Sequence, residues 1–405
     1  MALMQSISRL GGWEGYRLVS VEETQRNGDR WCVIRLAPIR RRRSRCSGCG
    51  RAVRGVHDEV ERRVRDLPLF AAQVELIVPR RRLACAHCGP RLEALSWLAS
   101  HARVTARLAA SVARLCQVTS VRHAAAFFGL NWKTVKAIDK VAMERELGPI
   151  DLSGVEVIGL DEFAIQKGHR YATVVVDPTC KRVLWVGRGR GREDVRPFFE
   201  LLGAGCARIK AAVMDMSAAF AQEVRAQCPQ AQIVYDLFHV VAKYSREVID
   251  RVRVDAANRV RDDRPRRKVI KTARWLLLRN PSSLSGDEPV RLRELLAANR
   301  SLLTVYLLKD ELKRLWRYRR HTWARKAWKT WRQRAMRSRL EPLKRFARNL
   351  EPYLEGIFSH CRWPLGTNLI EGINNKIKVI KRTAYGFRDD AYFFLKIRAA
   401  FPGNG

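Results

Sequence analysis

Short apolar runs separated by polar turns dominate the first hundred residues. Tyr16 to Val21 and Trp31 to Leu36 are predicted strands, and Asn27-Gly28 between them is a strong signal for a two-residue hairpin turn. Two further strands are predicted at Val60 to Val64 and Gln73 to Val78. The pattern therefore predicts a β-rich module at the N-terminus.

A helical spacing of apolar residues begins after residue 100. Val104 to Cys116 is predicted to be one helix, and Ser120 to Phe128 a second that ends at Gly129. Asn131 is expected to cap a third helix, Trp132 to Met143. The residues of this third helix predicted to face inward are Val135, Ile138 and Val141.

Two helices joined by a glycine-containing turn are typical of the helix-turn-helix that reads a DNA groove. On that interpretation Trp132, Lys133 and Lys136 would contact DNA from the third helix. The alternative is a three-helix packing unit without a ligand. The helical pattern by itself favours neither interpretation.

The central apolar stretch, Val155 to Leu160, predicts a buried strand that stops at Asp161. Two later apolar runs have the same form, since one leads into Asp215 and the other into Asp236. Ligands of open α/β sheets collect at the carboxyl ends of strands, and neighbouring strands lie about 4.8 Å apart. Asp161 and Asp215, if adjacent, could therefore share a pair of divalent metal ions.

The elements around these strands predict a mixed sheet. Tyr171 to Val176 and Arg182 to Val186 read as strands joined by the turn Asp177-Pro178-Thr179. Helices are expected near Val195 to Leu202 and at Ala218 to Gln227. A meander followed by alternating helices and strands implies an α/β fold with helices on both faces of the sheet.

A third acidic ligand is sought in the amphipathic stretch 368–382. Its apolar stripe consists of Ile370, Ile373, Ile377 and Ile380, and a polar stripe holds Glu371, Asn375, Lys378 and Arg382. This polar stripe suits a metal ligand followed by contacts to a DNA backbone. Asn368 and Glu371 also have the spacing of a capping box, so the residues alone leave the role of Glu371 open.

Charge is the most unusual feature of the composition. The 405 residues contain 78 Lys and Arg against 40 Asp and Glu, a net charge of +38, which points to a polyanion such as nucleic acid. A general basic bias without a specific partner is the alternative. Residues 241–350 alone contain 32 Lys and Arg against 11 Asp and Glu, in a stretch predicted to be a helical insertion.

Four tryptophans lie among the basic residues of this insertion: Trp316, Trp323, Trp328 and Trp331. Such interleaving is found on surfaces that stack unpaired bases. Tryptophan is usually largely buried, so a place in the core of the insertion is equally consistent, and different rings could take different roles.

Four of the ten cysteines form a metal-ligand pattern, Cys46-x-x-Cys49 and Cys85-x-x-Cys88, with a glycine after each pair. Four thiolates complete the tetrahedral shell of one structural Zn²⁺; unrelated pairs or disulfides are the alternative. The 35 residues between the pairs require a hairpin there. Arg41 to Arg45 and Arg80 to Arg82 flank the pairs and suit phosphate contact. The other six cysteines fit small buried residues in a reducing compartment.

No run of 18 apolar residues and no signal peptide is found in the sequence. These observations predict a cytoplasmic protein without a membrane partner.

Several motifs in this order are similar to those of the bacterial insertion-sequence transposases of the ISL-three family. They are the two CxxC pairs, the helix-turn-helix, GLDEFA (159–164), VMDMSAAF (213–220), YDLFHV (235–240) and NLIEGINNKIK (368–378). The resemblance implies an RNase H-like fold with a DDE triad, which falls on Asp161, Asp215 and Glu371. Asp236 and His239 match a related Asp-x-x-His signature, and we expect them to support the site from outside the metal ligands.

Five segments follow from these predictions. They are a zinc-binding module (1–100), a helix-turn-helix (101–150), the first part of an RNase H-like catalytic domain (151–240), a basic helical insertion (241–356) and the second part of the catalytic domain (357–405).

The resemblance implies a transposase that uses two Mg²⁺ or Mn²⁺ ions to cut transposon ends and join them to target DNA. It also implies at least a dimer, which brings two ends together near the bacterial nucleoid. The rivals are a zinc-containing DNA-binding regulator without catalytic activity and a zinc-stapled structural or RNA-binding protein.

Overall fold

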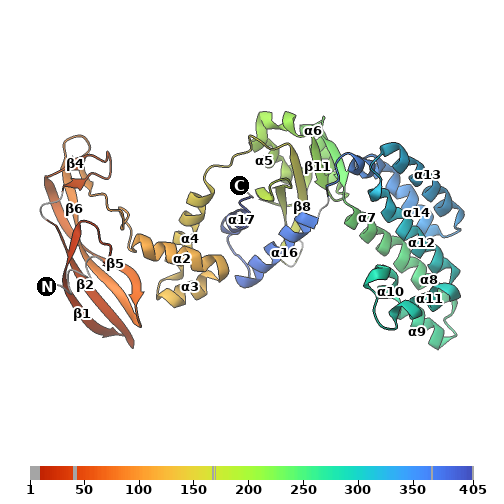
Figure 1. The fold of residues 1–405 in the computed structure, drawn as a ribbon, viewed down its shortest axis with the longest axis horizontal. Coiled ribbons are helices and arrows are strands. Elements are labelled where there is room, and N and C mark those ends of the chain that lie inside the picture. Colours follow the sequence, from red (N-terminus) through yellow and green to blue (C-terminus); the bar gives the residue numbers. More distant parts are fainter. Residues whose placement is uncertain (1–9, 40–42, 167, 169, 366–367, 404–405) are drawn as a thin grey trace. The chain divides into compact units, whose positions relative to one another are not determined.

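The computed structural model describes residues 10–39, 43–166, 168, 170–365 and 368–403 (Figure 1). The chain divides into two compact units, residues 1–148 with 380–395 and residues 149–379 with 396–405. Among the described residues, none of the helices is both long and apolar enough to cross a bilayer.

Two long hairpins form the N-terminal sheet (Figure 1). Its strands are β1 (Tyr16–Arg26), β2 (Asp29–Pro38), β5 (Val56–Leu69), β6 (Ala72–Cys85) and β7 (Gly89–Leu92); the short pair β3 (Ser44–Arg45) and β4 (Ala52–Val53) lies apart. Asn27 and Gly28 both have positive φ, as the predicted hairpin turn requires. The β5–β6 hairpin lies between the two CxxC pairs, which confirms the hairpin expected there.

The arginines beside the CxxC pairs are held within this module. Arg80 is buried and donates to the Glu93 carbonyl, while Arg81 pairs with the Glu93 carboxylate at 2.7 Å and Arg82 pairs with Asp58. The predicted phosphate contacts by these three arginines therefore compete with internal partners. Arg41 and Arg42 lie outside the described residues.

The three predicted helices are present as α2 (Ala106–Val118), α3 (Val121–Phe128) and α4 (Trp132–Leu147). Gly129 ends α3 in the left-handed conformation, and Asn131 accepts a hydrogen bond from the Lys133 backbone N–H as the cap of α4. Asp66, buried in β5, accepts hydrogen bonds from Thr105 and Arg107 at the start of α2. This acidic side chain joins the sheet to the helices.

The inward face predicted for α4 is partly wrong. Val135 is buried, but Val141 is 63% exposed and Asp139 is buried in its stead. The Tyr392 hydroxyl donates to the Asp139 carboxylate, and Tyr392 belongs to α17 (Asp390–Ala399). Without Tyr392 as a partner, the Asp139 carboxylate would favour an exposed position. The sequence pattern shows no such partner, so it predicts that the apolar Val141 faces inward.

A five-stranded mixed sheet forms the centre of the second unit, with the order β10-β9-β8-β11-β12. Its strands are β8 (Val157–Gln166), β9 (Arg170–Asp177), β10 (Arg182–Arg188), β11 (Ala211–Met214) and β12 (Gln232–Tyr235). The first three form an antiparallel meander, and β11 runs parallel to both β8 and β12. The predicted mixed sheet is confirmed.

The strand expected to stop at Asp161 continues to Gln166. Beyond Leu160, strand β8 loses its parallel neighbour β11 but keeps its antiparallel pairing with β9. Asp161 therefore lies within β8, at the level where β11 ends.

Alternate residues along the strands are buried on opposite faces of the sheet, in two separate hydrophobic clusters. Ile158, Leu160 and Met214 point to one face and pack with α5 (Arg192–Leu202) and α6 (Ala218–Gln227). Val157, Val213 and their neighbours point to the other face, against Trp363 and Leu365. The Trp363 indole N–H donates to Gln232 Oε1 at 3.0 Å on this second face.

A run of helices follows β12 (Figure 1). They are α7 (Leu237–Tyr244), a π-helical turn (Ser245–Ile249), α8 (Asp250–Arg259), α9 (Arg264–Thr272), α10 (Arg274–Leu278), α11 (Glu288–Ala298), α12 (Arg300–Arg314), α13 (His321–Arg337), α14 (Glu341–Leu350) and α15 (Leu354–Phe358). Single 3₁₀ turns are Pro281–Ser283, Leu315–Arg317, Glu351–Tyr353 and Ser359–Cys361, and a longer one, Gly203–Arg208, follows α5. Their buried side chains are continuous with the α5 and α6 side of the sheet.

Three of the four tryptophans belong to this helical core. Trp316, Trp328 and Trp331 are buried, and the last two stack with centroids 5.0 Å apart. The Trp316 indole donates to the Tyr235 carbonyl, which attaches the helices to β12. Trp323 alone of the four is exposed, at 56%, so base stacking is open only to this ring.

Glu223 on α6 joins the two helices that cover the first face of the sheet. Its buried carboxylate pairs with Arg192 at 2.7 Å and Arg196 at 3.1 Å, both on α5, and accepts a hydrogen bond from Gln227. Burial raises the pKa of Glu223, but the arginines and Gln227 outweigh it and lower the pKa to about 2.

We expect Glu223→Gln to lower the free energy of unfolding by about 2 kcal/mol at pH 7, because charge-assisted hydrogen bonds to both arginines are weakened. The native pKa is depressed, so this stabilisation is present above the ordinary pKa of 4.5 and is lost as the pH falls towards about 2. Urea unfolding at pH 7 and pH 3 measures the effect. A difference from wild type that is as large at pH 3 as at pH 7 would contradict this assignment.

Candidate active site and metal centres

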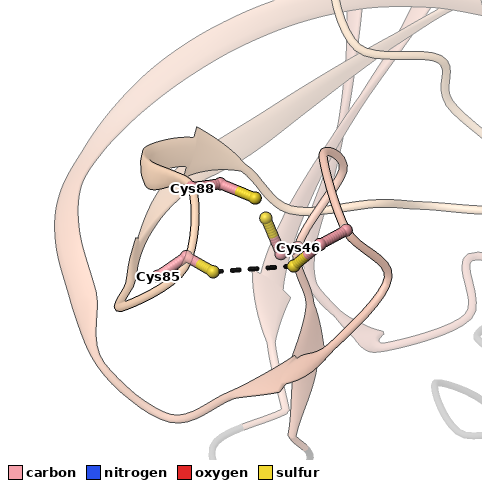
Figure 2. Close-up of side chains that lie close together, drawn as sticks. Cys46, Cys85 and Cys88 are labelled. Atoms are coloured by element: carbon pink, nitrogen blue, oxygen red, sulfur yellow. Dashed lines mark hydrogen bonds between the residues drawn. The ribbon is translucent and has the colours of Figure 1, made fainter.

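The four cysteines of the two CxxC pairs converge. Their Sγ atoms all lie within 4.8 Å of one another, and Cys49 and Cys85 are 3.7 Å apart. Figure 2 shows the sulfurs of Cys46, Cys85 and Cys88 pointing towards a common centre from two separate turns. A tetrahedral Zn²⁺ with Zn–S bonds of about 2.3 Å requires sulfurs about 3.8 Å apart. The cluster therefore fits a structural zinc ion.

The turns that carry these cysteines are shaped for metal binding. Gly50 and Gly89 have φ near +70°, a conformation that side-chain-bearing residues rarely adopt. Backbone N–H groups of Cys88 and His87 face the Cys85 sulfur and lower the pKa of Cys85 to about 7, which favours the thiolate. His87 is itself exposed, so the four cysteines form the cluster without it.

Asp161 lies within β8, and Asp215 and Asp236 directly follow the neighbouring strands β11 and β12. Met214 is in register with Leu160 on one side and with Tyr235 on the other, and each aspartate is the next residue. Because side chains in register share a face of a sheet, all three aspartates belong to the face of Val213 and Val234. Asp161 and Asp215 thus follow paired residues of neighbouring strands. Among the described residues, the only group of three or more ligands close enough to share an ion is the cysteine cluster, so Glu371 is not brought together with this pair.

Burial makes Asp161 and Asp215 unusually weak acids. Burial is the main cause that raises the pKa of Asp161, the backbone N–H of Glu162 and the His239 ring oppose the rise, and the nearby Asp215 carboxylate adds to it; the resulting pKa is about 6. The pKa of Asp215 is also raised, mainly by burial. Two neighbouring, partly desolvated carboxylates are a donor set that a divalent cation would stabilise.

Asp236 and His239 form a second layer beside this pair. Asp236 is buried, caps α7 through the Phe238 backbone N–H, and has its Oδ2 3.3 Å from His239 Nδ1. The nearby Asp236 carboxylate raises the pKa of His239 most, and Asp161 and Asp215 raise it further. A protonated His239 would therefore offset part of the negative charge of the three aspartates.

Helix α16 (Asn368–Thr383) contacts the aspartate-bearing face of β8. A Cβ placed on Gly159 would lie 2.7 Å from Ile370 Cδ1, so the helix approaches the strand closely there. One turn later Asn374 Nδ2 donates to Asp161 Oδ2 at 2.6 Å. Glu371 follows Ile370 directly and is exposed. The side chain of Asn368, and with it the alternative capping box, lies outside the described residues.

The amphipathic pattern of α16 is confirmed except at Asn374. Ile370, Ile373 and Ile377 are buried, but Asn374 is also only 9% exposed. Asn374 is not among the residues predicted for the site, because an Asn-Asn pair on a helix gives no signal that one of the two amides is buried.

The residues predicted to contact DNA are mostly accessible. Trp132 and Lys133 are exposed at the start of α4, as are Asn375, Lys378 and Arg382 on α16. Lys136 is different, since its Nζ pairs with Asp389 Oδ2 at 2.6 Å and lies over the Tyr392 ring. The charge of Lys136 is therefore partly compensated within the protein.

A zinc-binding cysteine cluster, a helix-turn-helix and a sheet with neighbouring, partly buried carboxylates are the parts of an enzyme that binds, cuts and joins DNA. Comparison with protein families assigns all three. Residues 158–397 match a transposase family model of the ISL3 type, residues 93–140 match the helix-turn-helix domain of transposase family ISL3, and residues 42–88 match the zinc-finger of transposase IS204/IS1001/IS1096/IS1165. The chain belongs to the ISL3 family of insertion-sequence transposases, and it is a DNA transposase.

Two relatives cover almost the whole chain. The transposase for insertion sequence element IS1001 of Bordetella parapertussis is 56% identical over 404 residues, which is 99% of this chain and 98% of the relative. The transposase for insertion sequence element IS1557 of Mycobacterium tuberculosis is 28% identical over 394 residues, 91% of this chain and 88% of the relative. The predicted family, zinc module and helix-turn-helix are thereby confirmed.

Proposed function

We propose that this transposase cuts the ends of its insertion sequence and joins them to target DNA with two divalent cations, Mg²⁺ or Mn²⁺, held by Asp161, Asp215 and Glu371. The observation that carries the proposal is the pair of partly buried, weakly acidic carboxylates that directly follow the paired positions Leu160 of β8 and Met214 of β11. When bound, two such ions activate a water or a 3′ hydroxyl and stabilise the leaving oxygen. Carboxylate oxygens are the ligands that Mg²⁺ prefers.

The contact of α16 with β8 supports the inclusion of Glu371. The two residues that touch the strand, Ile370 and Asn374, flank Glu371 within one helical turn, so its carboxylate projects from the edge of this contact. A sheet of three antiparallel strands followed by two parallel ones, with acids on the central strands, supports the RNase H-like assignment of the fold.

Within this site, we assign Asp236 and His239 to orienting and charge-balancing roles. The same oxygen of Asp236, Oδ2, accepts the Phe238 backbone N–H and lies 3.3 Å from His239 Nδ1, so this carboxylate is suited to holding the imidazole. An imidazolium at His239 stabilises the carboxylates before cations bind.

The N-terminal modules, residues 1–100 and 101–150, are proposed to recognise the terminal inverted repeats, with Trp132 and Lys133 at the DNA and Lys136 in a weaker role. Asn375, Lys378 and Arg382 would contact the DNA backbone beside the catalytic residues. Because two transposon ends must be brought together, we propose at least a homodimer, acting on nucleoid DNA in the cytoplasm of a bacterium. The remaining segments are the catalytic domain, 151–240 with 357–405, and the helical insertion, 241–356.

A plasmid carrying two transposon ends tests the proposal. Wild-type protein with Mg²⁺ should nick or cut at the ends, and EDTA should stop the reaction. Glu371→Gln should lower the cleavage rate on the order of 10³-fold, because it removes one anionic ligand, while end binding in a gel-shift assay stays within about twofold. A wild-type protein that only shifts DNA mobility would instead be a regulator. Normal cleavage by Glu371→Gln would remove this residue from the triad.

A further inference from the structure

Asn374 holds one oxygen of the central carboxylate. Its Nδ2 donates to Asp161 Oδ2 at 2.6 Å, and the backbone N–H of Glu162 donates to Asp161 Oδ1 at 2.8 Å. Each oxygen of a carboxylate can accept two such interactions. Both Asp161 oxygens are therefore fixed in orientation, and each keeps a lone pair for a cation.

The position of Asn374 is set by a match of spacing between helix and strand. Ile370 and Asn374 are four residues apart on α16, a rise of about 6 Å. Gly159 and Asp161, which they contact, are two residues apart on β8, about 6.6 Å. Because Ile370 fills the space above Gly159, the helix cannot slide, and the amide stays opposite the carboxylate.

The carbonyl oxygen of the Asn374 amide lacks a partner in the described part of the chain, which indicates that the site binds a ligand. Asn374 Oδ1 is buried and has no hydrogen-bond partner among the described residues, and Asn374 as a whole is 9% exposed. A buried carbonyl oxygen without a partner is destabilising. Neutral carbonyl oxygens are also among the groups that surround divalent cations in proteins, so this atom is better suited to a filled site than to an empty one.

We propose that Asn374 is a positioning residue that orients Asp161 and thereby sets the affinity of the site for divalent cations. The inference rests on the proposed function of Asp161 as a metal ligand. Groups that orient ligands change metal affinity by 10- to 100-fold when they are removed. A residue that only filled space would change folding stability and leave metal affinity alone.

Titration of Mn²⁺ into the full-length protein without DNA separates these roles, with free Mn²⁺ followed by electron paramagnetic resonance. Asn374→Leu keeps the volume and burial of the side chain and removes the amide. Ile373→Val is the matched control, because it removes buried packing from the neighbouring position and keeps the amide. Asp215→Asn defines which part of the Mn²⁺ signal belongs to the site.

We expect Asn374→Leu to weaken the Asp215-dependent Mn²⁺ binding by 10- to 100-fold and to raise the Mg²⁺ concentration for half-maximal end cleavage by a similar factor. Ile373→Val should lower the melting temperature and leave both metal values unchanged. If Asn374→Leu fails to fold, Asn374→Ser, whose hydroxyl is too short to span the same distance, provides the same measurement.

Two results would overturn the inference in different ways. Unchanged Mn²⁺ affinity in a folded Asn374 variant, with Asp215-dependent binding intact in the wild type, would reduce Asn374 to a packing residue and leave the proposed function standing. A wild type without any Asp215-dependent Mn²⁺ binding would refute the metal site and the inference together.

Discussion

Replacing Asp215 with asparagine is expected to abolish DNA cleavage and strand joining by this transposase while leaving its binding to transposon ends unchanged. The substitution keeps the shape of the side chain and removes the negative charge of Asp215, one of the two neighbouring carboxylates of the site. A loss of about 4 kcal/mol of transition-state stabilisation corresponds to a rate decrease on the order of 10³-fold. The measurement is the single-turnover cleavage rate of labelled end DNA at saturating Mg²⁺.

The melting temperature of the Asp215→Asn protein tests the electrostatics of the same site independently of activity. Burial raises the pKa of Asp215, so in the metal-free protein its ionised form destabilises the native state at every pH above that raised value. Without divalent ions at pH 7, the variant should therefore melt at the same temperature as wild type or above it. An inactive variant that melts well below wild type would have lost its fold and would say nothing about catalysis.

Glu156 offers a matched control for this experiment. It lies at the opposite end of the β8 and β11 pair from the aspartates and is 2.7 Å from Lys210, with both side chains more than half exposed. Glu156→Gln makes the same chemical change as Asp215→Asn, in the same pair of strands. It should cleave DNA at the wild-type rate, and Asp215→Asn cleavage at that rate would defeat the assignment of the catalytic pair.

The alignment of the aspartates could be predicted because local pattern and sheet geometry agree. The runs that precede Asp161, Asp215 and Asp236 are short and mostly apolar, as in strands buried on both faces. When such strands pair in parallel, their ends come to the same edge of the sheet. The extension of β8 to Gln166 could not be predicted from the sequence. It depends on pairing with the neighbouring strand β9, which the local pattern does not show.

Buried polar residues account for the other differences between sequence and structure. Asn374 and Asp139 both occupy inward positions, and each is held by a partner more than 200 residues away in the sequence. Hydrophobic periodicity assigns such residues to the surface, because the partner that makes their burial favourable belongs to another element. For the tryptophans of the insertion the sequence leaves core and DNA surface open, and the fold buries Trp316, Trp328 and Trp331 but exposes Trp323.

The second large effect is expected from the cysteine cluster. Replacing Cys85 and Cys88 together with alanine should reduce the zinc content from about one ion per chain to none, since half of the ligand shell is lost. The strands around the cluster, β3, β4 and β7, have two to four residues each and contribute few buried side chains. Structural zinc sites contribute on the order of 10 kcal/mol to folding, so this end of the module should unfold.

The loss of zinc is expected to affect DNA binding but not the fold of the second compact unit. The unit that carries Asp161 and Asp215 has its own buried core and should keep its melting transition in the double cysteine variant. Affinity for transposon ends should fall on the order of 10²-fold, towards the affinity for unrelated DNA. Atomic absorption, limited proteolysis and gel-shift assays measure the three effects.

Cys32→Ala is the control for the cysteine variant, because Cys32 is buried in the same N-terminal sheet but lies outside the cluster. It should retain zinc and end binding with a modest loss of stability, since only one small buried group is removed. If the double variant bound transposon ends as tightly as Cys32→Ala, recognition would lie wholly in the helix-turn-helix. The zinc would then stabilise the module without any part in reading DNA.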